Sequence, residues 1–459
     1  MLRTLFLIPH EFAGIPVLGV GWVLAALVAI TLIRLGLAWH SGGWQQVAIM
    51  ASGEGVFWLI AVAIIVVLGP RLELTNVAGE PVGVAVRGYG AFLMLAAASA
   101  VGLAAYRGNL LGKRHDHAAE GLCIQGEMIY ALAPWVMVGG LAGARVFYVV
   151  QYNEQFLRPT WSATFAAMAN LTQGGLVVYG GFIGGFLAAL LACHRHRWPI
   201  GLIGDAIAPC LFVGLFFGRL GCLMNGCCWG GACEPGAFAA HFPPGSPVYQ
   251  EQMLSGRLVG LQGLPTSAAD KHASQREMKV TEVAIGSIAA ANGVNPGDTI
   301  TLSLDGASQT LAPQTRPAEE SLPGLALYRK GRLLGRFWQN ELPEQALSVR
   351  ATQVISSLFA ACAFAWILGW ERILARRKNP VPSGTLMLIA FATYALMRLI
   401  LEWIRVDEAG QFGTGLSISQ WVSLGVLLAC VGALIARLRT RSDHDQSSPP
   451  HDVTQANAA

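Results

Sequence analysis

Long apolar runs recur along this chain and limit what it can fold into. A helix that crosses a bilayer needs about 20 mostly apolar residues, because the hydrocarbon offers the backbone no hydrogen-bond partners. Hydrophobic residues make up 54% of the 459 positions and charged residues only 13%, against about 25% charged in soluble domains. We therefore predict an all-α polytopic membrane protein of about nine transmembrane helices, over residues 16–38, 55–70, 82–105, 128–150, 174–193, 199–222, 352–374, 384–405 and 415–436.

Basic residues alternate along the connections between these spans. Arginine and lysine gather in loops 106–127, 194–198 and 371–383 and after residue 436, and are scarce in loops 151–173 and 406–414. The positive-inside rule then places the basic loops and the C-terminus in the cytoplasm, and the N-terminus outside. The first 14 residues lack the cleavage pattern of a signal peptide, so the first span is predicted to act as an uncleaved insertion signal.

Residues 234–350 contain no spanning run and are predicted to form a soluble insertion on the outer side. Within it, residues 279–283 alternate as a strand would, and the stretch that runs into Pro296-Gly297-Asp298 resembles the core of a PDZ-like module. Because the carboxylate-binding loop of such modules is not evident, we favour a β-rich insertion that does not bind peptides. The tail after residue 441 is polar and predicted to be disordered.

The predicted span 199–222 ends in a polar, glycine-rich block. Arg219 and Asn225 stand among four glycines between residues 218 and 230. A charge at membrane depth costs about 2.5–3.5 kcal/mol on insertion scales, so it usually has a function. Glycines let the backbone approach a ligand closely. This block therefore predicts a polar, anion-binding site inside a membrane protein.

A second polar set lies on one helical face. Tyr394, Arg398, Glu402 and Arg405 are spaced four, four and three apart, which places them on the same side of a helix. One interpretation is a self-neutralising ladder that fixes helix packing. The other is that Arg398 and Arg219 face one cavity and clamp an anion, because guanidinium binds phosphate bidentately and keeps its charge when buried. In a membrane the available phosphate is a lipid head group.

Two further groups have both a structural and a functional interpretation. Six glycines surround Tyr179 between residues 174 and 185; they favour either close helix packing or a re-entrant turn that lines a substrate site. Arg145 and Asp205 also fall inside predicted spans. They form either a structural pair, with Arg145 otherwise snorkelling to the outer surface, or part of the polar site.

Four cysteines gather near the end of the span 199–222, namely Cys222, Cys227, Cys228 and Cys233. The spacing C-x4-C-C-x4-C is not a standard zinc pattern. A disulfide on the outer face is the stronger expectation, and we predict no metal and no cofactor. The cysteines inside the other spans are expected to be small buried apolar residues.

These blocks, in this order, resemble the bacterial prolipoprotein diacylglyceryl transferase family over about residues 82–235 and 352–436. Arg219, Gly221, Asn225, Gly226 and Gly230 match its signature, and the other matching blocks are Arg87–Gly90, Gly143–Tyr148, Tyr152-Asn153, Asp205–Pro209, the Tyr394 face and Ser419-Gln420. The chain departs from the family pattern where Cys222 replaces an asparagine, Cys227-Cys228 replaces a pair that is often Glu-Leu, and Tyr179 replaces a histidine of many members. Residues 350–353 are a weakened form of the family's His-Pro-Ser-Gln.

The resemblance implies a membrane enzyme that transfers the diacylglyceryl group of phosphatidylglycerol to the lipobox cysteine thiol of a preprolipoprotein, forming a thioether and releasing glycerol phosphate. Its partners would be the lipid, the signal peptide and the bilayer of the bacterial inner membrane, with no nucleic acid. The implied catalytic residues are Arg219, Arg398, Tyr179 and Asn225, and the implied substrate-binding residues are Tyr89, Arg145, Gly180, Gly181, Gly221, Gly226, Gly230, Tyr394, Glu402 and Arg405.

The resemblance also divides the chain. It predicts an extra N-terminal transmembrane pair, a core in two parts separated by the insertion, and a cytoplasmic tail, over residues 1–81, 82–233, 234–350, 351–440 and 441–459. The thiol-activating base is the open point, because the phenol of Tyr179 is a poor base near neutral pH. We favour the arginines as the groups that lower the thiol pKa.

Three alternatives stay open on the sequence alone. A phospholipid or anion transporter could use the same arginine pair without chemistry, although no inverted repeat is visible. A thiol-redox membrane protein could use the four clustered cysteines. A divergent, inactive member of the family is the third, because Tyr179 and Cys222 depart from its pattern.

Overall fold

A computed structural model describes residues 4–12, 15–16, 74–75, 81–115, 124–153, 156–169, 175–266, 274–305, 324–338, 340–376, 381–404 and 414–447, together with isolated positions between 29 and 44. The chain forms two compact units, each made of two stretches that lie far apart in the sequence. One unit comprises Met1–Ala91 and Gly221–Ala351, and the other comprises Phe92–Leu220 and Thr352–Ala459.

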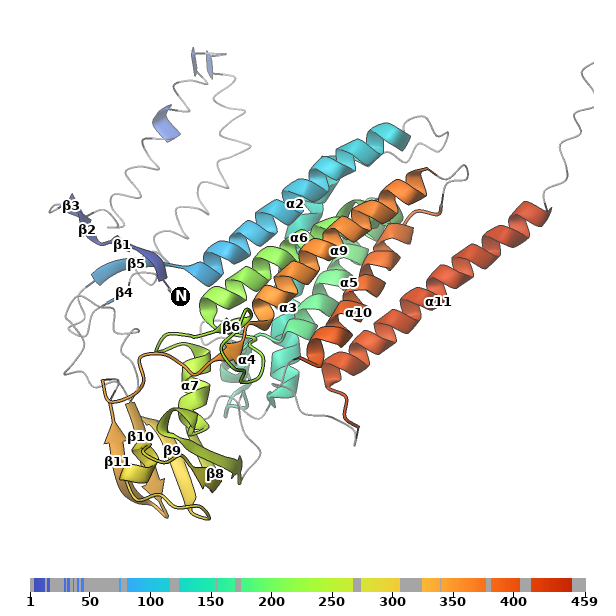
Figure 1. The fold of residues 1–459 in the computed structure, drawn as a ribbon. Helices are drawn as coiled ribbons and strands as arrows, with labels where there is room; N and C mark the ends of the chain where they lie inside the picture. The colour runs from blue at the N-terminus through green and yellow to red at the C-terminus, as the bar shows by residue number, and fades with distance from the viewer. Residues whose placement is uncertain are drawn as a thin grey trace, which may run out of the picture. The chain divides into compact units, whose positions relative to one another are not determined.

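Seven helices in the described part of the chain are long and apolar enough to cross a membrane, which confirms a mostly helical membrane protein. The predicted spans 16–38 and 55–70 lie almost wholly outside the described residues. The predicted span 82–105 starts too early, because Pro81–Arg87 form strand β5. The helices, seen in Figure 1, are α2 (Gly88–His115), α3 (Gly126–Gln151), α5 (Val178–His196), α6 (Ile200–Asn225), α9 (Thr352–Ala375), α10 (Thr385–Glu402) and α11 (Ile418–Ser447).

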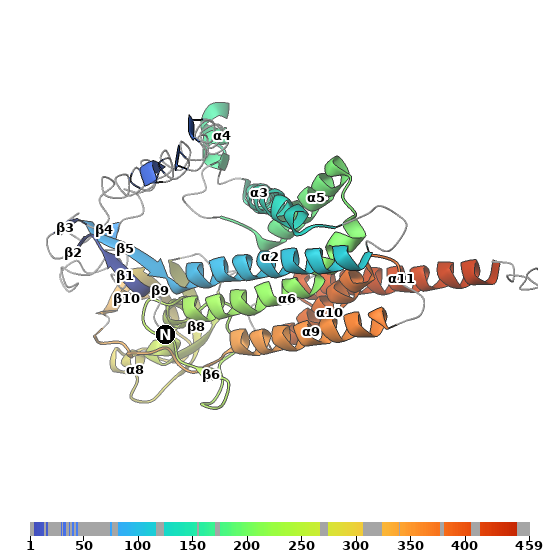
Figure 2. The same cartoon turned by 90° about the horizontal axis from the view of Figure 1, so that it is seen from above.

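Glycines set the closest helix contact, between α3 and α5, which lie side by side (Figure 2). A Cβ atom built on Gly143 would lie 2.3 Å from the carbonyl oxygen of Gly180, and one on Gly184 would lie 2.3 Å from that of Gly139. Both helices therefore carry a small-xxx-small pattern that lets their backbones touch. The packing interpretation of the glycine cluster is thus supported at Gly180 and Gly184.

Replacing Gly143 with alanine is expected to destabilise this contact by about 1–3 kcal/mol, because the added methyl group meets backbone rather than a movable side chain. Thermal unfolding of the purified protein in detergent measures the loss. Gly102→Ala in α2 is the matched control, because a Cβ atom built on Gly102 meets no heavy atom within 4 Å. Equal unfolding temperatures for the two variants would contradict the packing role.

Helices α6, α9 and α10 share an apolar core. Ala208 and Phe212 of α6 pack in one buried cluster with residues of α9 and with Leu386 and Ala390 of α10. At the start of α10, the carboxylate of Asp205 accepts hydrogen bonds from the backbone N–H of Gly384 at 2.7 Å and of Met387 at 3.0 Å. Asp205 thereby satisfies donors that a helix N-terminus leaves unpaired, and its negative charge complements the helix dipole.

A buried ion pair joins α2 to α9. Arg107 binds Glu371 at 2.8 Å, and its guanidinium also donates to the carbonyl oxygens of Asp205 and Ala206 in α6. One side chain therefore connects three helices. This contact was not predicted, because its partners are separated by 98 to 264 positions in the sequence.

The other unit holds the β-structure. Strand β1 (Thr4–Pro9) pairs antiparallel with β5 (Pro81–Arg87), and β5 pairs with β4 (Leu74–Thr75). Residues 234–350, the predicted insertion, contain an antiparallel sheet in the order β11–β10–β9–β8–β7, so their predicted β-rich character is confirmed. The bounds are β7 (Leu261–Pro265), β8 (Gln275–Val283), β9 (Thr299–Asp305), β10 (Gly324–Arg329) and β11 (Arg332–Phe337).

In β8, Met278 and Val280 are buried between exposed neighbours, but the alternation predicted over residues 279–283 stops at Thr281 and Glu282, which are both exposed. Short elements complete the description: β2 (Glu11–Phe12), β3 (Ile15–Pro16), α4 (Trp161–Ala169), β6 (Ala239–Ala240), α7 (Pro247–Leu254), η2 (Arg257–Val259), α8 (Ile288–Ala291) and β12 (Val349–Arg350). The pairing of β6 with β12 brings the two ends of the insertion together.

Candidate functional site

A polar network joins α5, α10 and α11 within the helical unit. The hydroxyl of Tyr179, in the first turn of α5, shares a hydrogen bond with the hydroxyl of Ser419 in α11. Nη2 of Arg398 in α10 donates to the same Ser419 oxygen at 3.0 Å. Ser419 therefore connects two predicted catalytic residues that lie 219 positions apart in the sequence.

Glu402 holds Arg398 from the other side. Nη2 of Arg398 lies 3.0 Å from the Glu402 carboxylate, as expected for residues one helical turn apart. The Glu402 side chain is only 4% exposed, and its other oxygen accepts a hydrogen bond from the Ser417 hydroxyl. Arg405, the last member of the predicted ladder, lies outside the described residues. Glu402 and Ser419 both contact Nη2, so the guanidinium fork is held at one corner.

Arg219 and Arg398 lie at the same depth along two parallel helices. Asp205 of α6 binds the start of α10, and Phe212 packs in the same cluster as Ala390, so both helices run in the same direction. Arg219 is 14 positions after Asp205, and Arg398 is 14 positions after Gly384. At 1.5 Å per residue, each arginine lies about 21 Å beyond this shared start.

Helix periodicity relates both arginines to the core that α6 and α10 share. Arg219 follows Phe212 by two turns of α6, and Arg398 follows Tyr394 by about one turn of α10. Phe212 is buried in the shared core, and Tyr394 packs against that core. In the described part of the chain, no hydrogen bond or ion pair engages the half-buried Arg219 guanidinium. Its charge is therefore available to a ligand.

The polar block continues into the other unit beyond residue 220. Asn225 is the last residue of α6, and Gly226 follows it with a φ of 71°. A side chain at Gly226 would be strained by that φ and would meet Phe242 and Ser246 at 3.1 Å. Gly221 and Gly230 are buried, and the backbone N–H of Gly230 donates to the carbonyl oxygen of Arg350 at 2.8 Å. These signature glycines therefore shape the turn that follows α6.

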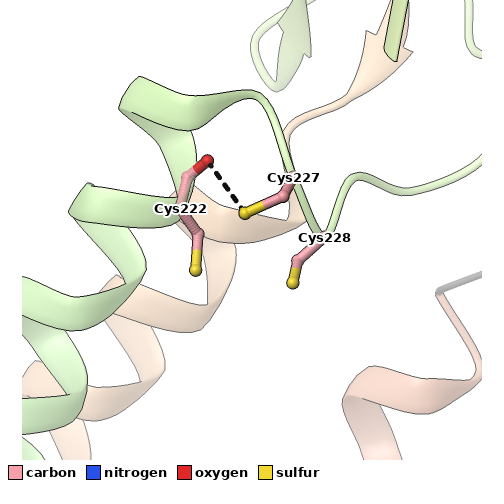
Figure 3. A group of neighbouring side chains, drawn as sticks. All are labelled: Cys222, Cys227 and Cys228. Atoms are coloured by element: carbon pink, nitrogen blue, oxygen red, sulfur yellow. Dashed lines mark hydrogen bonds between the residues drawn. The ribbon is translucent and has the colours of Figure 1, made fainter. Parts of the chain in front are cut away.

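Three of the four clustered cysteines come together at this turn. The sulfur atoms of Cys222, Cys227 and Cys228 all lie within 4.8 Å of one another, and none of the three is in a disulfide. In Figure 3 the Cys227 thiol points toward the backbone carbonyl oxygen of Cys222, which lies 3.7 Å from its sulfur, and the side chains of Cys222 and Cys228 point to the same side. The pKa of the Cys227 thiol lies above its ordinary value. The hydrogen bond with Cys222 lowers this pKa, but the hydrogen bond with Cys228 and burial together raise it by more. Cys233 instead lies 3.7 Å from the Ser348 hydroxyl.

Other predicted site residues have structural contacts. Arg145 is 8% exposed, donates to the carbonyl oxygens of Met168, Ala167 and Gly175 at 2.8 to 3.1 Å, and lies over aromatic rings. It does not pair with Asp205, whose carboxylate binds the start of α10. Gly180 lies in the contact with α3. A Cβ atom built on Gly181 would lie 3.5 Å from the carbonyl oxygen of Gly140 in the same helix α3.

Ser417 and Ser419 were not predicted as site residues. The only sequence signal was the Ser419-Gln420 pair at the start of the last span, which carries no charge and is therefore a weaker signal than a buried arginine. Tyr89 is 41% exposed in the first turn of α2. A Cβ atom on the preceding residue, Gly88, would lie 3.0 Å from that of Met224, so the start of α2 contacts the end of α6 near the cysteines.

Comparison with known proteins shows the family to which the chain belongs. Residues 77–436 match the family model of prolipoprotein diacylglyceryl transferase. A phosphatidylglycerol–prolipoprotein diacylglyceryl transferase of Rhodopirellula baltica is 50% identical over 98% of this chain and 92% of its own length. Proteins of the same description from Nitrobacter winogradskyi and Rhodospirillum rubrum are 35% and 34% identical, over 28% of this chain and 43% and 47% of theirs. The chain belongs to the prolipoprotein diacylglyceryl transferase family, and it is an enzyme of lipoprotein biogenesis.

Proposed function

We propose that this chain transfers the diacylglyceryl group from phosphatidylglycerol to the lipobox cysteine thiol of a preprolipoprotein, forming a thioether and releasing glycerol phosphate. The observation that carries the proposal is the placement of Arg219 and Arg398 at one depth along two parallel helices. Arg398 is held by Glu402 and Ser419, and Arg219 has no protein counter-ion in the described part of the chain. Two such cations suit the phosphate of a lipid head group.

The reaction needs charge stabilisation on the leaving group more than on the nucleophile. A sulfur nucleophile attacks the glyceryl carbon that bears the phosphate ester, the carbon–oxygen bond breaks, and negative charge grows on the departing phosphate. Preorganised guanidinium groups stabilise that charge without reorganising at the moment of reaction. Glu402 and Ser419 serve this step by fixing the direction of the Arg398 fork.

The remaining site residues have supporting roles in this proposal. Asn225 and Tyr394 donate hydrogen bonds to the head group, and Tyr89 contacts lipid or peptide. Arg405 supplies a further positive charge. Gly181, Gly221, Gly226 and Gly230 keep the path of the substrates clear of side chains. Arg145 and Gly180 act indirectly, by holding the ends and the faces of α3 and α5 in place.

The location of the protein also belongs to the proposal. The charge bias of the loops supports a multi-pass protein of the bacterial inner membrane, with the N-terminus and the insertion outside and the C-terminus in the cytoplasm. Residues 1–81 would add a transmembrane pair before the core. Residues 234–350 would form an outer soluble module between the two parts of the core, 82–233 and 351–440. The PDZ-like resemblance of that module remains a proposal of the same kind. The tail predicted to be disordered begins inside α11, which extends to Ser447, and its residues 448–459 lie outside the described residues.

Purified full-length protein in phosphatidylglycerol vesicles tests this function. A synthetic lipobox peptide should gain the mass of a diacylglyceryl group on its cysteine, with one glycerol phosphate released for each peptide modified. A peptide with serine in place of that cysteine is the control and should stay unmodified. Movement of lipid between leaflets without any glycerol phosphate release would support the transporter alternative, and an inert, folded protein would support an inactive family member.

Tyr179→Phe should reduce the rate of lipidation by less than about tenfold, because Arg398 keeps its hydrogen bond to Ser419 when the phenol is removed. Ser419→Ala should cost more, since it removes the oxygen that both side chains share. Initial rates of glycerol phosphate release compare the two variants. If Tyr179→Phe were as inactive as a variant lacking Arg398, Tyr179 would take part in the chemistry and not only in positioning.

A further inference from the structure

The three thiols at the end of α6 have the geometry of a metal site. Zinc–sulfur bonds of about 2.3 Å place sulfurs around one zinc ion roughly 3.8–4.0 Å apart. The sulfurs of Cys222, Cys227 and Cys228 all lie within 4.8 Å of one another (Figure 3), so small side-chain rotations bring them to that spacing. All three residues belong to one compact unit and are half-buried.

The backbone is bent to bring these thiols together. Cys222 lies in the last turn of α6, and the chain then reverses through Gly226 at a φ of 71° and Cys228 at a φ of 59°. A left-handed conformation is uncommon for a residue with a side chain and persists where its surroundings require it. Here it accompanies a placement of the Cys228 sulfur within 4.8 Å of the sulfurs of Cys222 and Cys227.

Three ligands leave one coordination position open, which is the pattern of catalytic rather than structural zinc sites. In the sequence the three thiols adjoin the predicted chemistry, because Cys222 follows Arg219 by three positions and Cys227 follows Asn225 by two. The reaction alkylates a thiol, and a thiol that coordinates a cation of this kind is deprotonated.

We propose that Cys222, Cys227 and Cys228 bind Zn²⁺, or another thiophilic cation, through three thiolates, and that the lipobox thiol of the substrate becomes the fourth ligand. The role of the fourth ligand rests on the proposed function; the three-thiolate site does not. This replaces the expectation of a disulfide and of no metal, which rested on spacing that matches no standard zinc motif.

The step balances without an oxidant or a reductant. The substrate S–H binds the cation as a thiolate, and its proton passes to water. The sulfur electron pair then forms the bond to the glyceryl carbon, and the carbon–oxygen bond breaks with its electrons on the phosphate of the departing glycerol phosphate. The thioether is a weaker ligand than the thiolate, so the product leaves and the cation stays with its three cysteines.

Cobalt binding to the reduced, metal-free, full-length protein tests the site. Co²⁺ should bind at about one ion per chain with the intense absorption of thiolate-to-cobalt charge transfer. Cys222→Ser and Cys228→Ser should lose that absorption, whereas Cys233→Ser, the matched control outside the cluster, should keep it. Addition of the lipobox peptide should shift the cobalt ligand-field bands, and the peptide with serine in place of cysteine should not.

Two results would overturn the site: no charge-transfer absorption in the reduced wild-type protein, or a disulfide among the three cysteines in protein alkylated as it is isolated. Equal lipidation rates with and without Zn²⁺ would overturn the fourth-ligand role and leave the transferase function standing. Normal cobalt spectra in a protein that modifies no peptide would confirm the three-thiolate site and count against the proposed function instead.

Discussion

Arg219→Ala is expected to lose about 10²- to 10³-fold in kcat/KM for lipidation, the loss typical of removing one group that stabilises developing charge in a water-poor site. The side chain is half-buried at the end of α6, and no described residue forms an ion pair with it. Its removal therefore leaves no buried partner without a counter-ion, and the unfolding temperature should stay near that of the wild type. Loss of activity without loss of stability is the signature of a ligand-binding charge.

The neighbouring glycine provides the control for Arg219. A Cβ atom on Gly218 meets no heavy atom within 4 Å, so Gly218→Ala changes the same turn of α6 without touching the charge. Rates of glycerol phosphate release from phosphatidylglycerol vesicles, and complementation of a transferase-depleted bacterium, measure both variants. Wild-type rates in Arg219→Ala would exclude the two-arginine clamp.

Arg398→Ala is expected to abolish lipidation and also to destabilise the fold. Glu402 is 4% exposed and paired with Arg398, and removing one member of a buried pair leaves the other charge uncompensated at a cost of about 3–5 kcal/mol. Activity lost in this variant alone would therefore not separate binding from folding.

Arg398→Lys separates the two effects. Lysine keeps the positive charge beside Glu402 but lacks the planar fork that binds phosphate bidentately. This variant should unfold close to the wild-type temperature and still lose at least roughly tenfold in kcat/KM. Unchanged kcat/KM in a folded Arg398→Lys protein would show that charge alone suffices at this position and would contradict a bidentate contact. Ser419→Ala, which removes the neighbouring acceptor, is the comparison variant.

Much of the architecture could be predicted because it depends on local composition. Hydropathy over about 20 residues identified each of the seven described membrane-length helices. Periodicity placed Arg398 and Glu402 on one face, and their ion pair is present. The beginning of α2 was misplaced, since an apolar strand and an apolar helix are equally hydrophobic, and only pairing with β1 shows that residues 81–87 are extended.

Whether a polar residue within a span serves the site or the fold could not be read from the sequence, because the answer lies in its partner. Arg145 and Arg219 look alike as isolated charges, yet one donates to three carbonyl oxygens and the other has no described partner. The signature block and the family pattern identified Arg219 and Arg398 from sequence alone. Only the tertiary structure placed Tyr179 beside Ser419 and gathered three cysteines of unmatched spacing, because hydrogen bonds and metal-binding geometry depend on distances that chain order does not encode.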